Sequence, residues 1–365
     1  MTSKELFYNI LKFSSDNKYP DIHLNSGHFP IYRNHNGDIE NIEKLDIHWE
    51  EVTLKKLTSD RVKEFIVEIV WEEWFFKFEK NLELDTSYPF GNWDRYRVNC
   101  YKDSNWFSIA LRIIPKEIPT IEELWLWDKV KEMCASWKGL ILITGPTWSW
   151  KSTNLAAMID YINKNFKKHI VTIEDPVEFS FSSNKSLINQ REIWNHTHWF
   201  TQAIRASLRE DPDVIMIWEM RDPETIKAAL TLAETWHLVL STLHTNDSVQ
   251  TVDRIVDIFP TWQQKQIRMQ LAMSLIWIMS QRLLPRKDKP WRIAAREMLI
   301  ANDATKSLII SWKTHQLYSV LEVWQKLWMI LMDKYLIALY KKEIISKDTL
   351  MSYIRDKESV EMLLD

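Results

Sequence analysis

The chain has 365 residues, of which 27% are charged, and a formal net charge of −3. This length predicts two globular domains, and without a dense Lys and Arg stripe the charge gives no electrostatic footprint for a nucleic-acid partner. The only cysteines, Cys100 and Cys134, make neither a disulfide framework nor a zinc site, which fits a reducing cytosol. The N-terminus lacks the apolar stretch of a signal peptide, and no apolar run approaches the roughly 20 residues that span a bilayer.

The first part of the chain predicts a small α+β domain. An amphipathic N-terminal helix comes first, and a turn is expected at Asn36–Asp38. Prolines on both sides of 116–118 break regular structure and mark a linker. We therefore place this domain at residues 1–112 and the linker at 113–122. Four short alternating segments are expected to be its strands: Ile22–Leu24, Ile31–Arg33, Tyr96–Tyr101 and Phe107–Arg112.

From residue 123 to 365 the pattern changes to buried strands that alternate with helices. A helix is expected from Ser152 to about Lys164, and from about Gln264 the pattern is mostly helical. Strand and helix alternating at this spacing predict a doubly wound α/β domain with a helical C-terminal region. Four apolar runs are expected to be its parallel strands: Leu140–Thr144, His169–Ile173, Val214–Ile217 and Leu238–Leu243.

Glycine and tryptophan are used in unusual amounts. The chain has 5 Gly and 20 Trp, whereas an average protein of this length, with roughly 7% glycine, would have about 25 Gly. If Trp148 and Trp150 are read as glycine, one segment becomes a complete phosphate-binding loop, G-x-x-x-x-G-K-[ST]. The residues of this P-loop, which we expect to bind ATP, are Gly145, Pro146, Thr147, Trp148, Ser149, Trp150, Lys151, Ser152 and Thr153.

We hypothesise that the gene uses a codon, with UGA the obvious candidate, that its own organism reads as glycine and that is translated here as tryptophan. A degenerate paralogue that lost its nucleotide site is the alternative. Decay would scatter several residue types over glycine positions, and it would not be expected to spare Lys151 and Ser152. Some tryptophans are expected to be genuine, and the reading as glycine is least expected at Trp49, Trp71 and Trp74.

A P-loop binds phosphate with successive backbone N–H groups and a helix N-terminus. Its glycines are needed for positive φ and because a side chain would occupy the phosphate space. Lys151 is expected to reach the β- and γ-phosphates, and Ser152 to hold Mg²⁺. An indole at Trp150 should block the nucleotide, so the chain with tryptophan should be inactive and the chain with glycine active.

Carboxylates follow two of the predicted strands. Glu174, Asp175 and Glu178 come at the end of the second strand, where the γ-phosphate of a bound nucleotide is expected. Glu219 follows the buried strand Val214–Ile217, and an acid at this place beside a P-loop strand serves the metal ion.

Two histidines, His237 and His244, flank the predicted strand Leu238–Leu243. A lone histidine at a strand end is more often structural. Two of them next to a phosphate site favour a role in sensing the nucleotide or in contacting a neighbouring subunit.

Together these motifs resemble the retraction ATPases of type IV pili, the PilT family within the type II/IV secretion ATPase superfamily, over nearly the whole chain. IEDPVEF resembles the Asp box, REDPDVIMIWEMRD the Walker B region and AETWHLVLSTLHTND the His box, with Trp218 and Trp236 read as glycine. VDRIVDIFP, SQRLLPR, KTHQLYSVLEVWQKLWMILMD and the N-terminal DIHLNSGHFPIYRNHNGDI also match, with Trp324 and Trp328 in glycine places. The family motif AIRNLIR is matched only in part, by Ala304–Ile310.

The resemblance implies a RecA-like P-loop NTPase domain behind a smaller PAS-like domain, with ATP and Mg²⁺ as cofactors. It implies that Glu178 is the general base and that Glu219 is the Walker B glutamate, which with Ser152 serves Mg²⁺. His237 and His244 match the His-box histidines. Arg97 and Arg112 match the N-domain arginines that are thought to reach the nucleotide.

The resemblance further implies a cytoplasmic homohexamer at the inner face of the membrane, docked on the inner-membrane platform protein of the pilus machinery. A pilus extension ATPase or a type II secretion ATPase is the alternative within the superfamily. Those relatives are usually longer and often carry a tetracysteine zinc site, unlike this chain with two cysteines. A non-catalytic ring subunit is the alternative if Trp148 and Trp150 are genuine.

Overall fold

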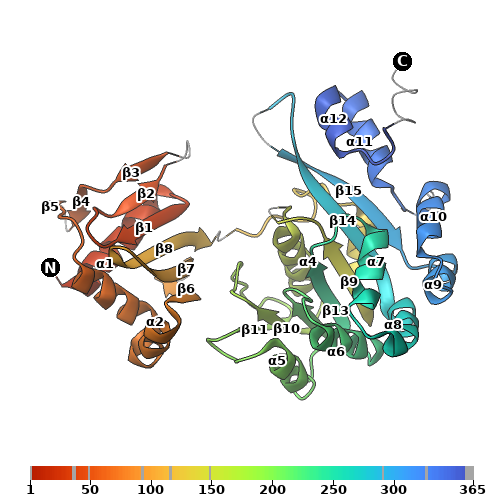
Figure 1. The fold of residues 1–365 in the computed structure, drawn as a ribbon, viewed down its shortest axis with the longest axis horizontal. Coiled ribbons are helices and arrows are strands. Elements are labelled where there is room, and N and C mark those ends of the chain that lie inside the picture. The colour runs from red at the N-terminus through yellow and green to blue at the C-terminus, as the bar shows by residue number, and fades with distance from the viewer. Residues whose placement is uncertain are drawn as a thin grey trace. The chain divides into compact units, whose positions relative to one another are not determined.

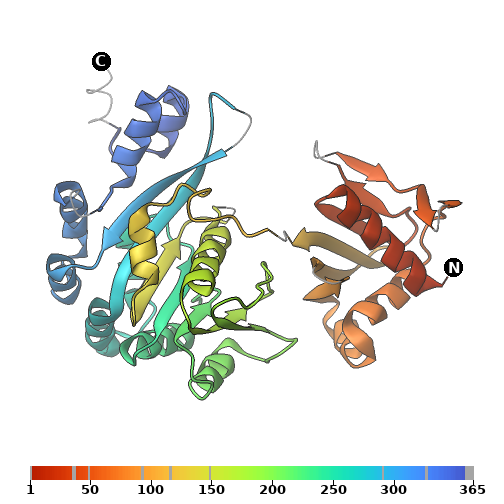
Figure 2. The same cartoon turned by 180° about the vertical axis from the view of Figure 1, so that it is seen from behind.

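The computed structural model describes residues 2–34, 38–47, 50–91, 94–114, 117–147, 149–289, 292–324 and 328–357. The chain divides into two compact units, shown as ribbons in Figures 1 and 2. The first unit comprises Met1–Glu117 together with the segments Asp175–Ser180 and Glu192–His196. The second unit comprises Ile118–Glu174, Phe181–Arg191 and Thr197–Asp365.

The first unit is built on a six-stranded sheet in the order β3-β2-β1-β8-β7-β6, in which neighbouring strands pair antiparallel. All four strands predicted in this region are present, and the predicted turn at Asn36–Asp38 falls partly outside the described residues. The sheet strands are β1 (Asp21–Asn25), β2 (Ile31–Arg33), β3 (Ile39–Asn41), β6 (Glu83–Phe90), β7 (Asp94–Asp103) and β8 (Trp106–Ile114). A separate antiparallel pair consists of β4 (Lys44–Ile47) and β5 (Glu50–Thr53).

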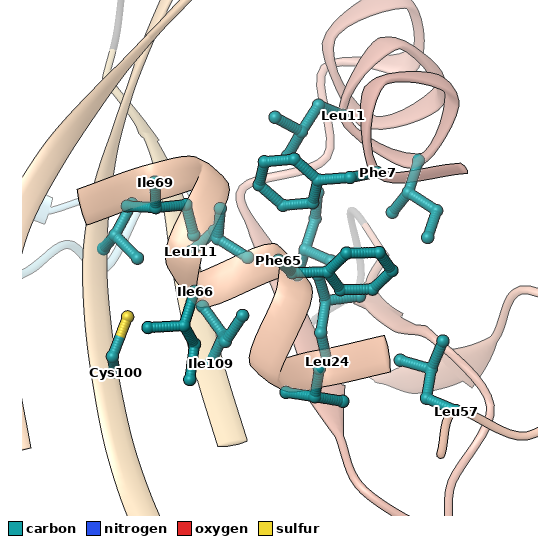
Figure 3. Packing of buried hydrophobic residues seen from close by; sticks show 14 of the residues in the cluster. Phe7, Leu11, Leu24, Leu57, Phe65, Ile66, Ile69, Cys100, Ile109 and Leu111 are labelled. Atoms are coloured by element: carbon teal, nitrogen blue, oxygen red, sulfur yellow. The ribbon is translucent and has the colours of Figure 1, made fainter. Parts of the chain in front are cut away.

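Two helices, α1 (Ser3–Asn17) and α2 (Ser59–Asn81), supply much of the apolar core of this unit. A capping box starts α1, because the Thr2 hydroxyl accepts from the Glu5 N–H while the Glu5 carboxylate accepts from the Thr2 N–H. Figure 3 shows how the side chains of these helices meet those of the sheet; Phe7 and Phe65 stack with ring centroids 5.2 Å apart. Burial in this core raises the pKa of the Cys100 thiol.

The second unit is a seven-stranded sheet in the order β11-β10-β12-β13-β9-β14-β15. From β10 to β14 the neighbours pair parallel, and only β15 is shown to pair antiparallel, with β14. This is the predicted RecA-like α/β domain, with the four predicted strands in its centre. The strands are β9 (Gly139–Thr144), β10 (His169–Glu174), β11 (Leu187–Glu192), β12 (Val214–Ile217), β13 (Leu238–Leu243), β14 (Leu275–Pro285) and β15 (Arg292–Ile300).

Helices cover both faces of this sheet (Figures 1 and 2). On one face α3 (Asp128–Cys134) and α4 (Lys151–Asn165) pack on apolar side chains of the central strands. The opposite face carries α6 (Pro223–Glu234), α7 (Ser248–Asp257) and α8 (Thr261–Ser274), and α5 (Phe200–Ser207) packs beside α6. None of the helices within the described ranges is long and apolar enough to cross a membrane.

The prediction that the chain is mostly helical from about Gln264 is wrong for the segment that forms β14 and β15. A continuous apolar run such as Leu275–Met279 has the same pattern in a buried strand and in a buried helix, so periodicity does not separate them. The remaining elements of this region are helical: α9 (Asp303–Ile310), the 3-10 turn η1 (Thr314–Gln316), α10 (Leu317–Val323), α11 (Met332–Lys341) and α12 (Lys347–Tyr353).

Tryptophan occupies most of the left-handed backbone positions that are not glycine. Of the eleven non-glycine residues with positive φ in the described ranges, seven are tryptophan, although tryptophan makes up only 20 of 365 residues. Their φ values lie between 56° and 86°, a region that favours glycine because it has no Cβ. The backbone therefore has the conformation of glycine at Trp106, Trp125, Trp150, Trp194, Trp236, Trp312 and Trp328.

Candidate nucleotide-binding site

The P-loop follows the central strand β9 and leads into α4, as the sequence predicts. Gly145 has φ of +150°, and a Cβ there would lie 2.3 Å from the backbone oxygen of Gln281, so no other residue fits. Trp148 lies outside the described residues. Trp150 has φ of +62° and is the N-cap of α4, without a side-chain capping bond. Both described ends of the loop thus have a backbone suited to glycine.

Lys151 is the first residue of α4, and its side chain is turned back into the loop. The Nζ atom donates to the backbone oxygens of Gly145, at 2.9 Å, and Pro146, at 3.1 Å. Ser152 and Thr153 follow on the same helical turn and are half-buried. A largely buried ammonium group at a helix N-terminus suits the binding of an anion such as a phosphate.

Glu219 lies just after β12, and its carboxylate contacts the side chains of Arg221 and His244. Its Oε2 atom is 2.8 Å from Nη2 of Arg221 and 3.3 Å from Nε2 of His244. Burial, and then the charge of Lys151, lower the pKa of His244, so its ring is neutral at pH 7. Sequence reasoning missed Arg221, although its place two residues after a predicted metal-binding acid was a usable signal.

The P-loop, Glu219 and His244 lie at the same edge of the sheet. Strands β12, β13 and β9 are parallel neighbours in register, so their carboxyl ends meet there. This edge is where ligands bind in open α/β sheets.

His237 lies at the other end of β13 from His244. Its Nδ1 atom is 3.2 Å from the backbone oxygen of Leu232 and 3.3 Å from Oγ1 of Thr235. An extended strand rises about 3.3 Å per residue, which separates the two histidines by roughly 20 Å. The structure therefore does not bring both histidines to the P-loop edge of one chain. The six residues of β13 between them were the signal for this separation.

Glu178, Arg97 and Arg112 belong to the first unit. Nη1 of Arg97 lies 3.6 Å from Oε1 of Glu178, and about a third of the Glu178 side chain is exposed. Arg97 and Arg112 are paired across β7 and β8, and Nε of Arg112 donates to Asp21 at 2.7 Å. Two of the predicted residues, Glu178 and Arg97, are thus in contact.

Glu174, in the second unit, has a different environment from Glu178. Its side chain is buried and its Oε1 atom accepts from Oγ1 of Thr172, at 2.5 Å, and Nε2 of Gln190, at 3.0 Å. These contacts hold Glu174 within the sheet. The more exposed Glu178 is the better placed of the two carboxylates to meet a water molecule.

A pocket of about 220 Å³ lies beside the P-loop and offers further side chains to a ligand. Pro146, Thr147 and Ser149 line one side, and Arg282, Arg292 and Tyr353 are among the residues of the other. Within the described part of the chain no three His, Cys, Asp or Glu side chains are grouped to hold a metal ion. The oxygens of Ser152 and Glu219 fit Mg²⁺, which needs only one or two protein ligands beside phosphates and water.

Comparisons with known proteins identify the family of this chain. Residues 109–317 match the family described as type II/IV secretion system protein. The chain is 42% identical over 309 residues to a twitching motility protein of Neisseria gonorrhoeae, covering 85% of this chain and 83% of the relative. It is 40% identical over 339 residues to the type IV pilus retraction ATPase PilT of Pseudomonas aeruginosa, covering 93% and 95%.

Among solved structures, the fold matches that of a pilus retraction motor PilT with bound ADP. The TM-score is 0.84 with 41% sequence identity, over 97% of this chain and 98% of the other. The segments predicted to be the P-loop, the Asp box, the Walker B region and the His box all fall within residues 109–317, which match the family model. The chain therefore belongs to the PilT family of type II/IV secretion ATPases.

Proposed function

We propose that this protein hydrolyses ATP to drive the retraction of a type IV pilus, the process behind twitching motility. The grouping of Lys151, Glu219 and His244 at one edge of a parallel sheet carries the proposal. Relatives that are 42% and 40% identical to this chain over most of their length are named for twitching motility and for pilus retraction. An extension or secretion ATPase with the same chemistry is the alternative within the superfamily.

The residues of this chain divide the work of hydrolysis between binding, metal support and water activation. The P-loop amides and Lys151 would hold the β- and γ-phosphates. Ser152 and Glu219 would hold Mg²⁺, which would neutralise charge on the phosphates. Arg221 and His244 fix the orientation of the Glu219 carboxylate by contacting its Oε2 atom.

Glu178 is the general base that takes the proton of the attacking water. Its neighbour Arg97, with Nη1 3.6 Å from Oε1 of Glu178, orients the carboxylate until the nucleotide is in place. Arg97 and Arg112 supply positive charge to the phosphates. Phosphoryl transfer to water is mostly positioning and charge stabilisation, so these roles are sufficient for hydrolysis.

The active form of the P-loop has glycine at positions 148 and 150. The φ of +62° at Trp150, within a loop that otherwise matches the motif, supports this assignment. Peptide mass spectrometry of the native protein should show glycine at 148, 150, 218, 236, 324 and 328. Tryptophan in those peptides would instead favour the non-catalytic ring subunit.

The working assembly is a homohexamer that docks on a platform protein at the inner face of the cytoplasmic membrane. Domain rotation during the ATP cycle would transmit force to the pilus machinery. His237, at the far end of β13, is a candidate contact with a neighbouring subunit.

The test is complementation of a bacterium that makes type IV pili but lacks its retraction ATPase. The chain with glycine at the two P-loop positions should restore twitching, and the same chain with Glu178→Ala should not. An ATPase-active chain that raises the number of pili without restoring twitching would indicate an extension motor.

A further inference from the structure

We propose that Gln281 is a positioning residue that holds the P-loop in the shape that binds phosphate; this rests on the proposed ATPase function. Gln281 lies on β14, next to the P-loop strand β9, and is fully buried. Its Nε2 atom donates to the backbone oxygen of Ser149, inside the loop. Its Oε1 atom accepts from Nδ2 of Asn154 at 2.5 Å.

Asn154 makes this contact part of a connection between three elements. It lies in the first turn of α4 and is also fully buried. One side chain of β14 is therefore bonded at the same time to the P-loop and to the helix that follows it. The loop and the helix N-terminus, which together form the anion site, are fixed to the sheet through Gln281.

The backbone of Gln281 fixes the other end of the loop. Its carbonyl oxygen lies only 2.3 Å from the place that a Cβ of Gly145 would occupy. The start of the loop thus rests on the main chain of Gln281 and the end of the loop on its side chain.

Peptide geometry links this contact to phosphate binding. The peptide group between Ser149 and residue 150 is planar and trans, so its C=O and N–H point in opposite directions. The bond from Gln281 holds the carbonyl towards β14 and therefore aims the N–H of residue 150 away from β14. That N–H belongs to the set with which a P-loop surrounds phosphate.

The amide of Gln281 is specifically required, because it donates on one side and accepts on the other. Gln281→Met keeps the length and removes both bonds. Gln281→Glu keeps the acceptor for Asn154 but sets an oxygen against the Ser149 carbonyl. Gln264→Met is the matched control, because Gln264 also donates from Nε2 to a backbone oxygen, that of Phe259 at 3.0 Å, away from the P-loop.

The experiment uses the full chain with glycine at 148 and 150 and measures two quantities. The first is ADP affinity with the KM and kcat for ATP. Both Gln281 variants should bind ADP about tenfold or more weakly, because a misdirected donor loses a charge-assisted bond to phosphate. KM should rise more than kcat falls, and Gln264→Met should match the parent.

The second quantity is hydrogen–deuterium exchange of the peptide that covers residues 145–153, measured without nucleotide. Exchange there should rise in both Gln281 variants and stay unchanged elsewhere in the second unit. Unchanged exchange together with parental ADP affinity would overturn the proposal, as would exchange that rises evenly over the unit. If the parent itself does not bind nucleotide, the proposed function fails, and the exchange measurement alone decides the role of Gln281.

Discussion

The P-loop from Gly145 to Lys151 and the strand ends that carry Glu219 and His244 are two sides of one site, but they depend on different properties of the chain. The P-loop works through backbone conformation, as shown by the positive φ of Gly145 and Trp150. The strand ends work through side chains in contact, as between Glu219 and His244. A bulky residue in place of glycine therefore affects the first side directly.

Trp218 and Trp150 illustrate this difference, because both are read as glycine in the motifs predicted from the sequence. Trp218 directly precedes Glu219 and is not among the residues with positive φ, and Glu219 keeps its contacts. Trp150 has positive φ and precedes Lys151 inside the loop. The same replacement adds only volume at one position and adds both volume and conformational strain at the other.

The largest expected effect comes from restoring glycine to the P-loop, the side of the site that depends on backbone conformation. The chain with Trp148→Gly and Trp150→Gly should bind ATP and hydrolyse it with Mg²⁺, whereas the chain with both tryptophans should show neither activity. Rotamer changes cannot relieve the block, because the missing features are loop conformation and free volume. Nucleotide binding and phosphate release measure the difference. Comparable hydrolysis by both chains would show that the P-loop argument is wrong.

The next effect separates two carboxylates of the Asp box. In the glycine form, Glu178→Ala should lower kcat by at least about a hundredfold, the range of general-base catalysis, and leave ATP affinity and ring assembly largely intact. Glu174→Ala, which removes a buried side chain bonded to Thr172, should mainly reduce thermal stability. Turnover, nucleotide affinity and melting temperature are measured for both variants. Normal turnover in Glu178→Ala with loss in Glu174→Ala would move the base to Glu174.

A smaller effect distinguishes the two sides of the site, because a change in the P-loop should reduce nucleotide affinity and a change at the strand ends should reduce turnover. Lys151→Ala should weaken nucleotide affinity itself, by about tenfold or more, because a charged partner of the phosphates is removed. Glu219→Ala should lower turnover and reduce the Mg²⁺ dependence of binding. Lys164→Ala is the control, since this lysine pairs with Asp160 at the far end of the same helix. Equal loss of affinity in Lys151→Ala and Lys164→Ala would contradict the assignment.

The smallest effect tests the backbone argument outside the site. Trp125 has φ of +56° and is 83% exposed, whereas Trp127 has φ of −72° and packs edge-on against Tyr335 at 6.1 Å. Trp125→Gly should raise the free energy of unfolding by about 1–2 kcal/mol, because it relieves a left-handed conformation. Trp127→Gly should lower it by about 1–3 kcal/mol, because it removes packing. Denaturant titrations decide this, and two changes of the same sign would be evidence against strain at Trp125.

Side chains with local signals were predictable from the sequence. The run Leu140–Thr144 and the P-loop after it led directly to β9, and Glu219 was found because an acid follows a short buried strand. The order of the strands in the sheet was not available from local patterns. Gln281 is more than 120 residues from Ser149, and only the pairing of β14 with β9 brings them together.

His237 and β15 show two further limits of prediction from the sequence. Both histidines were assigned to one site because they flank the same strand, but flanking a strand means lying at opposite ends of it. The strand β14 was missed because an apolar run buried on both faces carries no periodicity. The strand β15 was missed because the buried charged residues Arg296 and Glu297 interrupt its apolar pattern. Backbone conformation was the least predictable property. The low glycine count and the high tryptophan count nevertheless indicated that tryptophans occupy positions whose backbone suits glycine.

The left-handed tryptophans have a consequence for the movement of this gene between species. Seven such positions cost together about as much as the net stability of a domain, roughly 5–15 kcal/mol. If they carry a reassigned codon, a recipient that reads it as tryptophan makes a strained protein with a blocked P-loop. A recipient that reads it as a stop releases the chain before Gly145, since Trp106 and Trp125 come earlier. Only cells that share the donor's genetic code could then inherit a working motor.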